Sequence, residues 1–114
     1  MIKQKDQFTI TSSSNVRGGA GDIFRTAIFT AEELLEKAIH CTLLTIPAGS
    51  SIGEHAHGPE AELYYILSGT LRITDSGVTK DLTVGDAVFT GDGCTHSLEN
   101  VSGEEASLLA FVIK

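Results

Sequence analysis

Residues 49–69 are GSSIGEHAHGPEAELYYILSG, and this stretch decides the fold. His55 and His57 are two residues apart, so on an extended chain both imidazoles point to the same face. Glu62 follows a tight bend at Gly58-Pro59 and begins an apolar strand. That strand can run back beside the histidines and offer its carboxylate to the same point. The stretch therefore predicts two neighbouring strands with a group of metal-ligand side chains between them.

The chain on either side alternates short strand-like segments with turn signals. The segments rich in β-branched and aliphatic residues are 41–46, 62–67, 70–74, 78–82, 87–89 and 106–113. Glycine-containing turns separate most of them at hairpin intervals. Because no segment resembles a helix linking parallel strands, we predict an all-β fold with antiparallel pairing, either a sandwich or a closed barrel.

One helix is predicted over residues 30–37, because Thr30 and Glu33 have the spacing of a capping box. Before it, residues 8–10 resemble a strand, and the serine- and glycine-rich residues 12–21 resemble loops. We therefore divide the chain into an N-terminal arm (residues 1–39), with a short strand and the helix, and a β-barrel (residues 40–114). Both parts belong to one domain, since 114 residues leave no room for a second of ordinary size.

Charge and hydropathy exclude several classes of partner. Fifteen acidic and eight basic side chains give a net charge of −7, which repels nucleic acid and anionic lipid surfaces. The longest apolar run, residues 108–113, is far too short to cross a bilayer. The N-terminus lacks the apolar stretch of a secretory signal, so a cytoplasmic location is expected. In that compartment Cys41 and Cys94 should stay thiols.

A third imidazole, His96, also follows a glycine-rich turn. With His55, His57 and Glu62 it completes a set of three imidazoles and one carboxylate, which suits one divalent transition metal. We expect manganese or iron first, with nickel, zinc, copper and cobalt as alternatives. An isolated His-x-His pair occurs often by chance, so the glycine framework around it is needed to support a metal site.

That framework forms two blocks of fixed spacing. They are Gly49-x5-His55-x-His57-x4-Glu62-x6-Gly69 and Gly85-x5-Gly91-x-Gly93-x2-His96-x3-Asn100. The chain here resembles the cupin family and matches nine of the ten positions of its two motifs. The exception is Gly91, where the family has proline. The resemblance implies a double-stranded β-helix, or jelly-roll barrel, with a metal held in its interior by His55, His57, Glu62 and His96. We assign Asn100 a structural role, hydrogen-bonding a turn.

Strand alternation predicts the walls of a pocket. If Glu62 points inward, Tyr64 and Ile66 do so too, and Cys94 and Leu98 share a face with His96 if that strand is regular. Tyr64 could donate a proton and Cys94 could act as a nearby thiol or extra ligand. The alternative for both is ordinary packing.

Coordination number separates the possible functions. Four protein ligands close a tetrahedral zinc site, whereas an octahedral metal keeps two positions for water, dioxygen or a bidentate substrate. We expect a metal-dependent enzyme of the oxygenase or isomerase type, acting on a small oxygen-rich metabolite. The alternatives are a non-catalytic cupin that binds a sugar or keto acid, and a purely structural metal barrel. A homodimer is also expected, with the strand around residues 8–10 at the contact.

Overall fold

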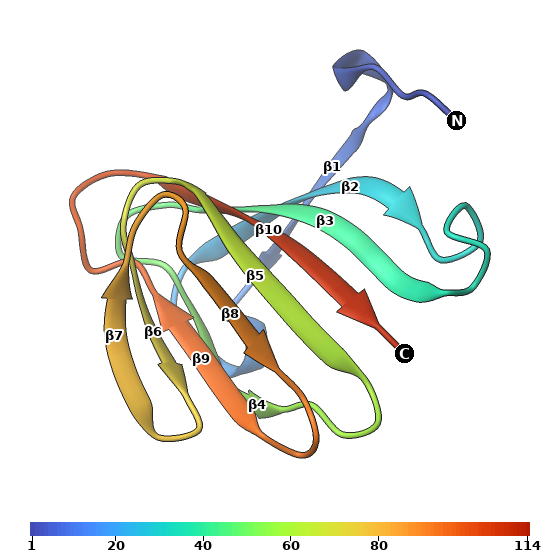
Figure 1. The fold of residues 1–114 in the computed structure, drawn as a ribbon. Helices are drawn as coiled ribbons and strands as arrows, with labels where there is room; N and C mark the ends of the chain where they lie inside the picture. The colour runs from blue at the N-terminus through green and yellow to red at the C-terminus, as the bar shows by residue number, and fades with distance from the viewer.

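The structure is a computed structural model that describes all residues 1–114, and it is built almost entirely of strands (Figure 1). The strands are β1 (Thr9–Ser14), β2 (Asp22–Thr30), β3 (Ala38–Ile46), β4 (Ser51–Ala56), β5 (Ala61–Ser68), β6 (Leu71–Asp75), β7 (Val78–Leu82), β8 (Ala87–Thr90), β9 (Thr95–Glu99) and β10 (Ala106–Ile113). Two 3₁₀ turns, η1 (Lys5–Gln7) and η2 (Val16–Gly18), are its helical elements. No helix is long and apolar enough to span a membrane.

The strands form two antiparallel sheets, which lie on opposite sides of the core (Figure 1). The larger has the order β1-β2-β3-β10-β5-β8 and the smaller has the order β4-β9-β6-β7. The all-β prediction is therefore confirmed. The closed barrel is not, because the ladders form two separate sheets with free edges at β7 and β8. Facing sheets lie about 10 Å apart, too far for backbone hydrogen bonds to join them.

The core lies between the sheets and follows from strand alternation. Every second residue of β10 is buried, and β3 and β5 follow the same pattern over most of their length. The buried apolar cluster is Ile23, Leu44, Ile46, Ile52, Tyr64, Ile66, Leu71, Ile73, Leu98, Ala106, Leu108 and Ala110. Asn100 lies at one end of this cluster, and its hydrogen bonds confirm the structural role that was predicted for this residue. Its side-chain amide donates to the carbonyl oxygens of Ile46 and Glu104, and its carbonyl accepts from Ser102.

All six strand segments predicted from hydrophobic pattern are present, as β3, β5, β6, β7, β8 and β10. Strand β2 was not predicted, and β4 and β9 were expected only from the motif histidines and not from hydrophobic pattern. In β4 and β9 the polar and glycine residues of the motifs hide the alternation, and in β2 several alternate positions are polar or only half-buried. The strand suspected at residues 8–10 is the beginning of β1.

The helix predicted over residues 30–37 is wrong. The capping box does form, since Thr30 N donates to the Glu33 carboxylate at 3.0 Å and Glu33 N donates to Thr30 Oγ1 at 3.2 Å. The chain then makes hydrogen-bonded turns and enters the left-handed region at Leu35 and Glu36, with φ of 56° and 57°. Because Thr30 and His40 are paired across β2 and β3, the chain must reverse here and has no room for a helix.

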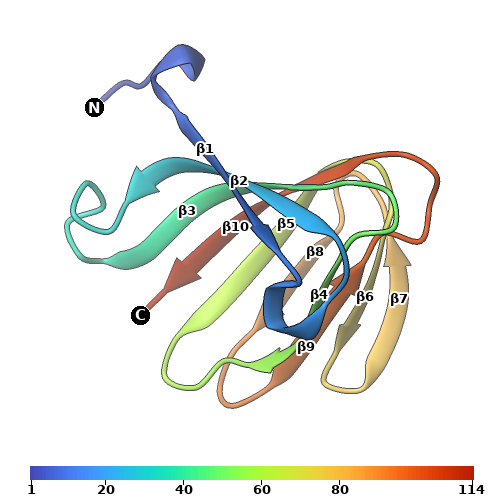
Figure 2. The same cartoon turned by 180° about the vertical axis from the view of Figure 1, so that it is seen from behind.

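The N-terminal arm is more ordered than its sequence predicts. Strand β2 pairs with β3 from Phe24 to Thr30, so this part of residues 1–39 belongs to the larger sheet. Strand β1 pairs with β2 and forms the outer edge, with all six of its residues exposed (Figure 2). The short η2 turn between them lies beside β4 of the other sheet.

Candidate metal centre

A β-bulge sets the position of His55. Ile52 pairs with Leu98 and His55 pairs with His96, so two residues of β4 between these pairs lie opposite one residue of β9. The extra residue shifts the phase of the strand, and both Ile52 and His55 therefore face the interior. His57 lies just beyond the end of β4, where its backbone N–H donates to Cys94 O.

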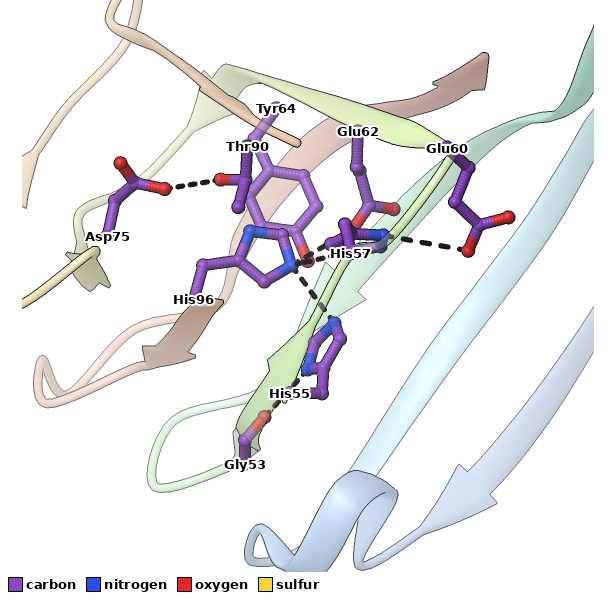
Figure 3. A network of polar contacts seen from close by, with 9 residues as sticks. All are labelled: Gly53, His55, His57, Glu60, Glu62, Tyr64, Asp75, Thr90 and His96. Atoms are coloured by element: carbon purple, nitrogen blue, oxygen red, sulfur yellow. Dashed lines mark hydrogen bonds and ion pairs between the residues drawn. The ribbon is translucent and has the colours of Figure 1, made fainter. Parts of the chain in front are cut away.

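The four predicted ligands come together at one point (Figure 3). The Nε2 atom of His96 lies 3.0 Å from Nε2 of His57 and 3.0 Å from Nε2 of His55. The Glu62 carboxylate is 3.2 Å from Nε2 of both His57 and His96. All four ligand atoms lie within 4.8 Å of one another, and His57, Glu62 and His96 are buried.

The hydrogen bonds of the imidazoles fit a bound cation. Nδ1 of His55 lies 2.9 Å from the carbonyl oxygen of Gly53, which can only accept, so the proton is on Nδ1 and the Nε2 lone pair faces the group. The buried Nδ1 atoms of His57 and His96 have no hydrogen-bond partner, although a Glu60 carboxylate oxygen lies 3.7 Å from that of His57. Three Nε2 atoms and a carboxylate oxygen cannot all satisfy one another by hydrogen bonds. A divalent metal among them would satisfy all four.

Burial and charge set the protonation of the residues around this point. Burial lowers the pKa of His55 below its ordinary value, which favours the neutral, metal-binding form. Burial raises the pKa of Glu62, but its hydrogen bond to His96 and the charges of His96 and His57 outweigh this and lower it overall. Burial, followed by the charge of Glu62, raises the pKa of Tyr64 well above its ordinary value, so this phenol stays protonated.

A cavity of about 160 Å³ opens beside the four residues. Its walls include His55, His57 and Glu62, while His96 lies behind them, 1% exposed. The side chains of Arg17, Arg25, His40 and Glu60 also line it. Neither arginine forms an ion pair, since the pairs made by lysine or arginine side chains are Lys3–Glu33, Arg72–Asp81 and Lys114–Glu36.

The four additional polar residues of the cavity were missed from the sequence. Arg17 lies in the segment that resembled loops, Arg25 lies in the unpredicted strand β2, and the His40 side chain faces inward from β3. Of the four, only His40 could have been predicted from the sequence. It lies on the same strand face as the buried residues Thr42, Leu44 and Ile46.

The predicted pocket residues have different environments. Tyr64 lines the cavity, and its hydroxyl lies 3.4 Å from Nε2 of His96, with the two rings stacked 4.8 Å apart. Ile66 and Leu98 point inward but belong to the hydrophobic core and do not line the cavity. Cys94 is exposed rather than in the pocket, because it precedes β9 in a turn and so does not follow the alternation of the strand.

Comparison with known proteins places this site in a family. The cupin-domain model Cupin_2 matches residues 42–112. An oxalate-binding protein of Thermotoga maritima is 34% identical over 113 residues, which are 99% of this chain and 93% of that protein.

Solved structures agree with this result. The crystal structure of a predicted oxalate decarboxylase from Thermotoga maritima superposes with a TM-score of 0.94 and 34% identity, covering 99% of this chain and 98% of the other. A cupin 2 conserved barrel domain protein from Rhodopseudomonas palustris has a TM-score of 0.79 at 16% identity, over 94% of this chain and 72% of that one, and so shows the fold alone. With the family motifs, the fold and the four-residue group all in agreement, this chain belongs to the cupin family.

Proposed function

We propose that this chain is a metal-dependent cupin that binds a small oxygen-rich anion of the oxalate class in the cavity beside its metal centre. One observation supports this most strongly. The four-residue group lies at a small cavity that two arginines without ion-pair partners also line. With a divalent metal bound, the metal and the two arginines would outweigh the carboxylates of Glu60 and Glu62 in the lining, and this net positive charge favours an anionic ligand.

The spacing of the ligand atoms favours an open metal site. Ligands at about 2.1 Å from an octahedral ion are about 3.0 Å apart when adjacent, whereas tetrahedral ligands at that bond length are about 3.4 Å apart. The His96–His57 and His96–His55 separations of 3.0 Å match the octahedral value, and the 3.2 Å separations of Glu62 from His57 and His96 lie between the two values. Four protein ligands then leave two positions, which a bidentate oxygen ligand can occupy. Manganese and iron accept this geometry with mixed nitrogen and oxygen ligands.

When bound, the divalent metal would supply Lewis-acid charge to an oxygen ligand. The surrounding residues set the charge at the centre. Glu62 would cancel one of the two metal charges and leave a net positive centre, while Tyr64 stays protonated with its hydroxyl 3.4 Å from Nε2 of His96. The cavity of about 160 Å³ is smaller than the roughly 300–1,000 Å³ typical of drug-sized ligands, so it fits a molecule of few atoms. The relative named as an oxalate-binding protein supports this size and charge.

A second candidate is an enzyme of the oxygenase or isomerase type that uses the same centre. Two groups able to exchange protons, His40 and Glu60, line the cavity outside the ligand set, and the protonated Tyr64 phenol can donate a hydrogen bond there. Glu60 is the most accessible of them, with 41% of its side chain exposed. Such groups are not needed for binding alone, but they are required for proton transfer.

Calorimetric titration of manganese-loaded and metal-free protein with oxalate tests the proposal. We expect the loaded protein to bind about one oxalate per chain and the metal-free protein to bind none. Equal binding by both forms, or none by either, would contradict it. Chromatography of the same mixtures under air distinguishes the two candidates, because conversion of oxalate or a keto acid to product supports an enzyme.

Two other expectations concern the whole molecule. The homodimer is favoured by β1, an edge strand whose residues are all exposed and whose outer backbone groups have no partner strand. Light scattering that gives the mass of a single chain at micromolar concentration would exclude it. The cytoplasmic location stays a prediction from the sequence.

A further inference from the structure

The loop of residues 15–21, which we call the arginine loop, is fixed to β4 by backbone contacts. The N–H of Ser51 donates to the carbonyl oxygen of Ala20 at 2.8 Å, and the N–H of Ala20 donates to Ser51 Oγ at 2.8 Å. The side-chain amide of Asn15 closes the loop by donating to Gly19 O at 3.1 Å. Figure 2 shows the turn η2 of this loop lying beside β4. The N-terminal arm thus reaches the strand that contains His55.

Two glycines make this close contact possible. A Cβ atom at Gly19 would overlap the carbonyl oxygen of Ser51, and one at Gly53 would overlap the carbonyl oxygen of Arg17. Because both obstacles are backbone atoms, neither can move aside as a flexible side chain would. The same Gly53 also accepts the hydrogen bond from His55 Nδ1, so the loop and the imidazole are positioned by one short segment.

Arg17 itself is held in an unusual conformation. Its φ of 53° lies in the left-handed region, which costs free energy for a residue with a Cβ atom. Leu35, Glu36, Ser76 and Asp92 share this region in turns elsewhere, so the conformation shapes the loop and does not by itself mark a ligand site. Arg17 is exposed, lines the cavity and makes no ion pair. Its positive charge reaches His55 and contributes to lowering the pKa of that imidazole.

We propose that Arg17 is a specificity-determining residue that pairs with the second carboxylate of a dicarboxylate ligand, while the first carboxylate faces the four-residue group. This inference rests on the proposed function and narrows its ligand class to dianions. A planar guanidinium can bind a carboxylate through two parallel hydrogen bonds, which a lysine ammonium cannot reproduce. A monoanion would leave Arg17 unpaired. Arg25 also lines the cavity, but it lies on β2 and not on the loop that contacts the segment of His55.

The test compares oxalate, a dianion, with glyoxylate, a monoanion of similar size, by calorimetry on manganese-loaded protein. In Arg17→Gln we expect oxalate affinity to fall roughly ten- to hundredfold, the effect of losing a charge-assisted pair, with glyoxylate affinity changed by less than about threefold. Arg17→Lys should restore only part of the loss. Lys37→Gln removes one exposed positive charge from the β2–β3 turn and is the control for net charge.

The role of the loop is tested separately. Gly19→Ala should lower oxalate affinity as Arg17→Gln does while manganese stoichiometry stays at that of the unmodified protein, which shows that the variant is folded. Gly103→Ala is the matched control, because a Cβ there meets no atom within 4 Å. If the unmodified loaded protein binds neither anion, the proposed function fails. If it binds oxalate and Arg17→Gln binds it equally well, the inference about Arg17 alone is overturned.

Discussion

The Thr90 hydroxyl donates a hydrogen bond to the Asp75 carboxylate and joins the two sheets directly behind the metal centre (Figure 3). Thr90 lies opposite Glu62 in the larger sheet, and Asp75 lies opposite His96 in the smaller one. Thr90 is buried, 1% exposed. The bond therefore connects the neighbours of two candidate metal ligands that belong to different sheets.

Removing this bond should weaken metal binding. Mutating a residue that holds metal ligands in position typically lowers metal affinity about ten- to a hundredfold. In Thr90→Val, which keeps the shape of the side chain, we expect manganese affinity to fall within that range when measured by competition with a chelator.

Thr79→Val is the control for this prediction. Thr79 also hydrogen-bonds across strands, to Thr74, but on an exposed face away from the centre. We expect it to bind manganese as the unmodified protein does. Equal affinity in all three proteins would show that the link between the sheets does not position the ligands.

Ile66 belongs to the hydrophobic core and not to the cavity. Although it shares a strand face with Glu62 and Tyr64, it is fully buried in the hydrophobic cluster. Ile66→Ala should lower the free energy of unfolding by about 2–5 kcal/mol, measured with urea, and leave metal stoichiometry unchanged. The neighbouring Leu67→Ala, at a position 45% exposed, should cost far less. Loss of metal from folded Ile66→Ala would place this side chain in the site after all.

Stability of the metal-free protein should fall in mild acid. Burial lowers the pKa of His40 below its ordinary value of 6.5; the charge of Arg25 acts in the same direction, and those of Glu62 and Glu60 oppose it. Below about pH 6.5 the unfolded chain therefore takes up this proton more readily than the folded one, so folding is penalised as pH decreases. His55 adds to the effect in the same direction.

Urea unfolding of chelator-treated protein at about pH 7.5 and pH 5.5 measures this dependence. We expect His40→Gln to lose less free energy of unfolding between the two values than the unmodified protein does. The same loss in both proteins would mean that His40 contributes nothing to the acid sensitivity.

Local spacing and period were sufficient to predict that the four side chains of the group lie together. His55, His57, Glu62 and His96 are fixed by short motifs, and the alternation of β5 and β10 is regular. The bulge that turns both Ile52 and His55 inward could not be predicted, because the extra residue is defined only by pairing with β9.

The missed features depend on contacts between distant segments. Arg17 and Arg25 reach the cavity only because the arginine loop packs on β4 and β2 joins the larger sheet. Thr30 and Glu33 satisfied a local rule for a helix start, yet the pairing of β2 with β3 required a reversal within a few residues. Tertiary pairing overrode the local preference there.

Elemental analysis of untagged protein tests the metal centre most directly. The unmodified protein and His40→Gln, whose imidazole lines the cavity outside the ligand group, should each contain about one divalent transition metal per chain, and His55→Ala should contain almost none. Electron paramagnetic resonance of the same samples identifies manganese, iron or copper. Protein without metal after growth with manganese and iron, or His55→Ala with as much metal as the unmodified chain, would contradict the ligand set.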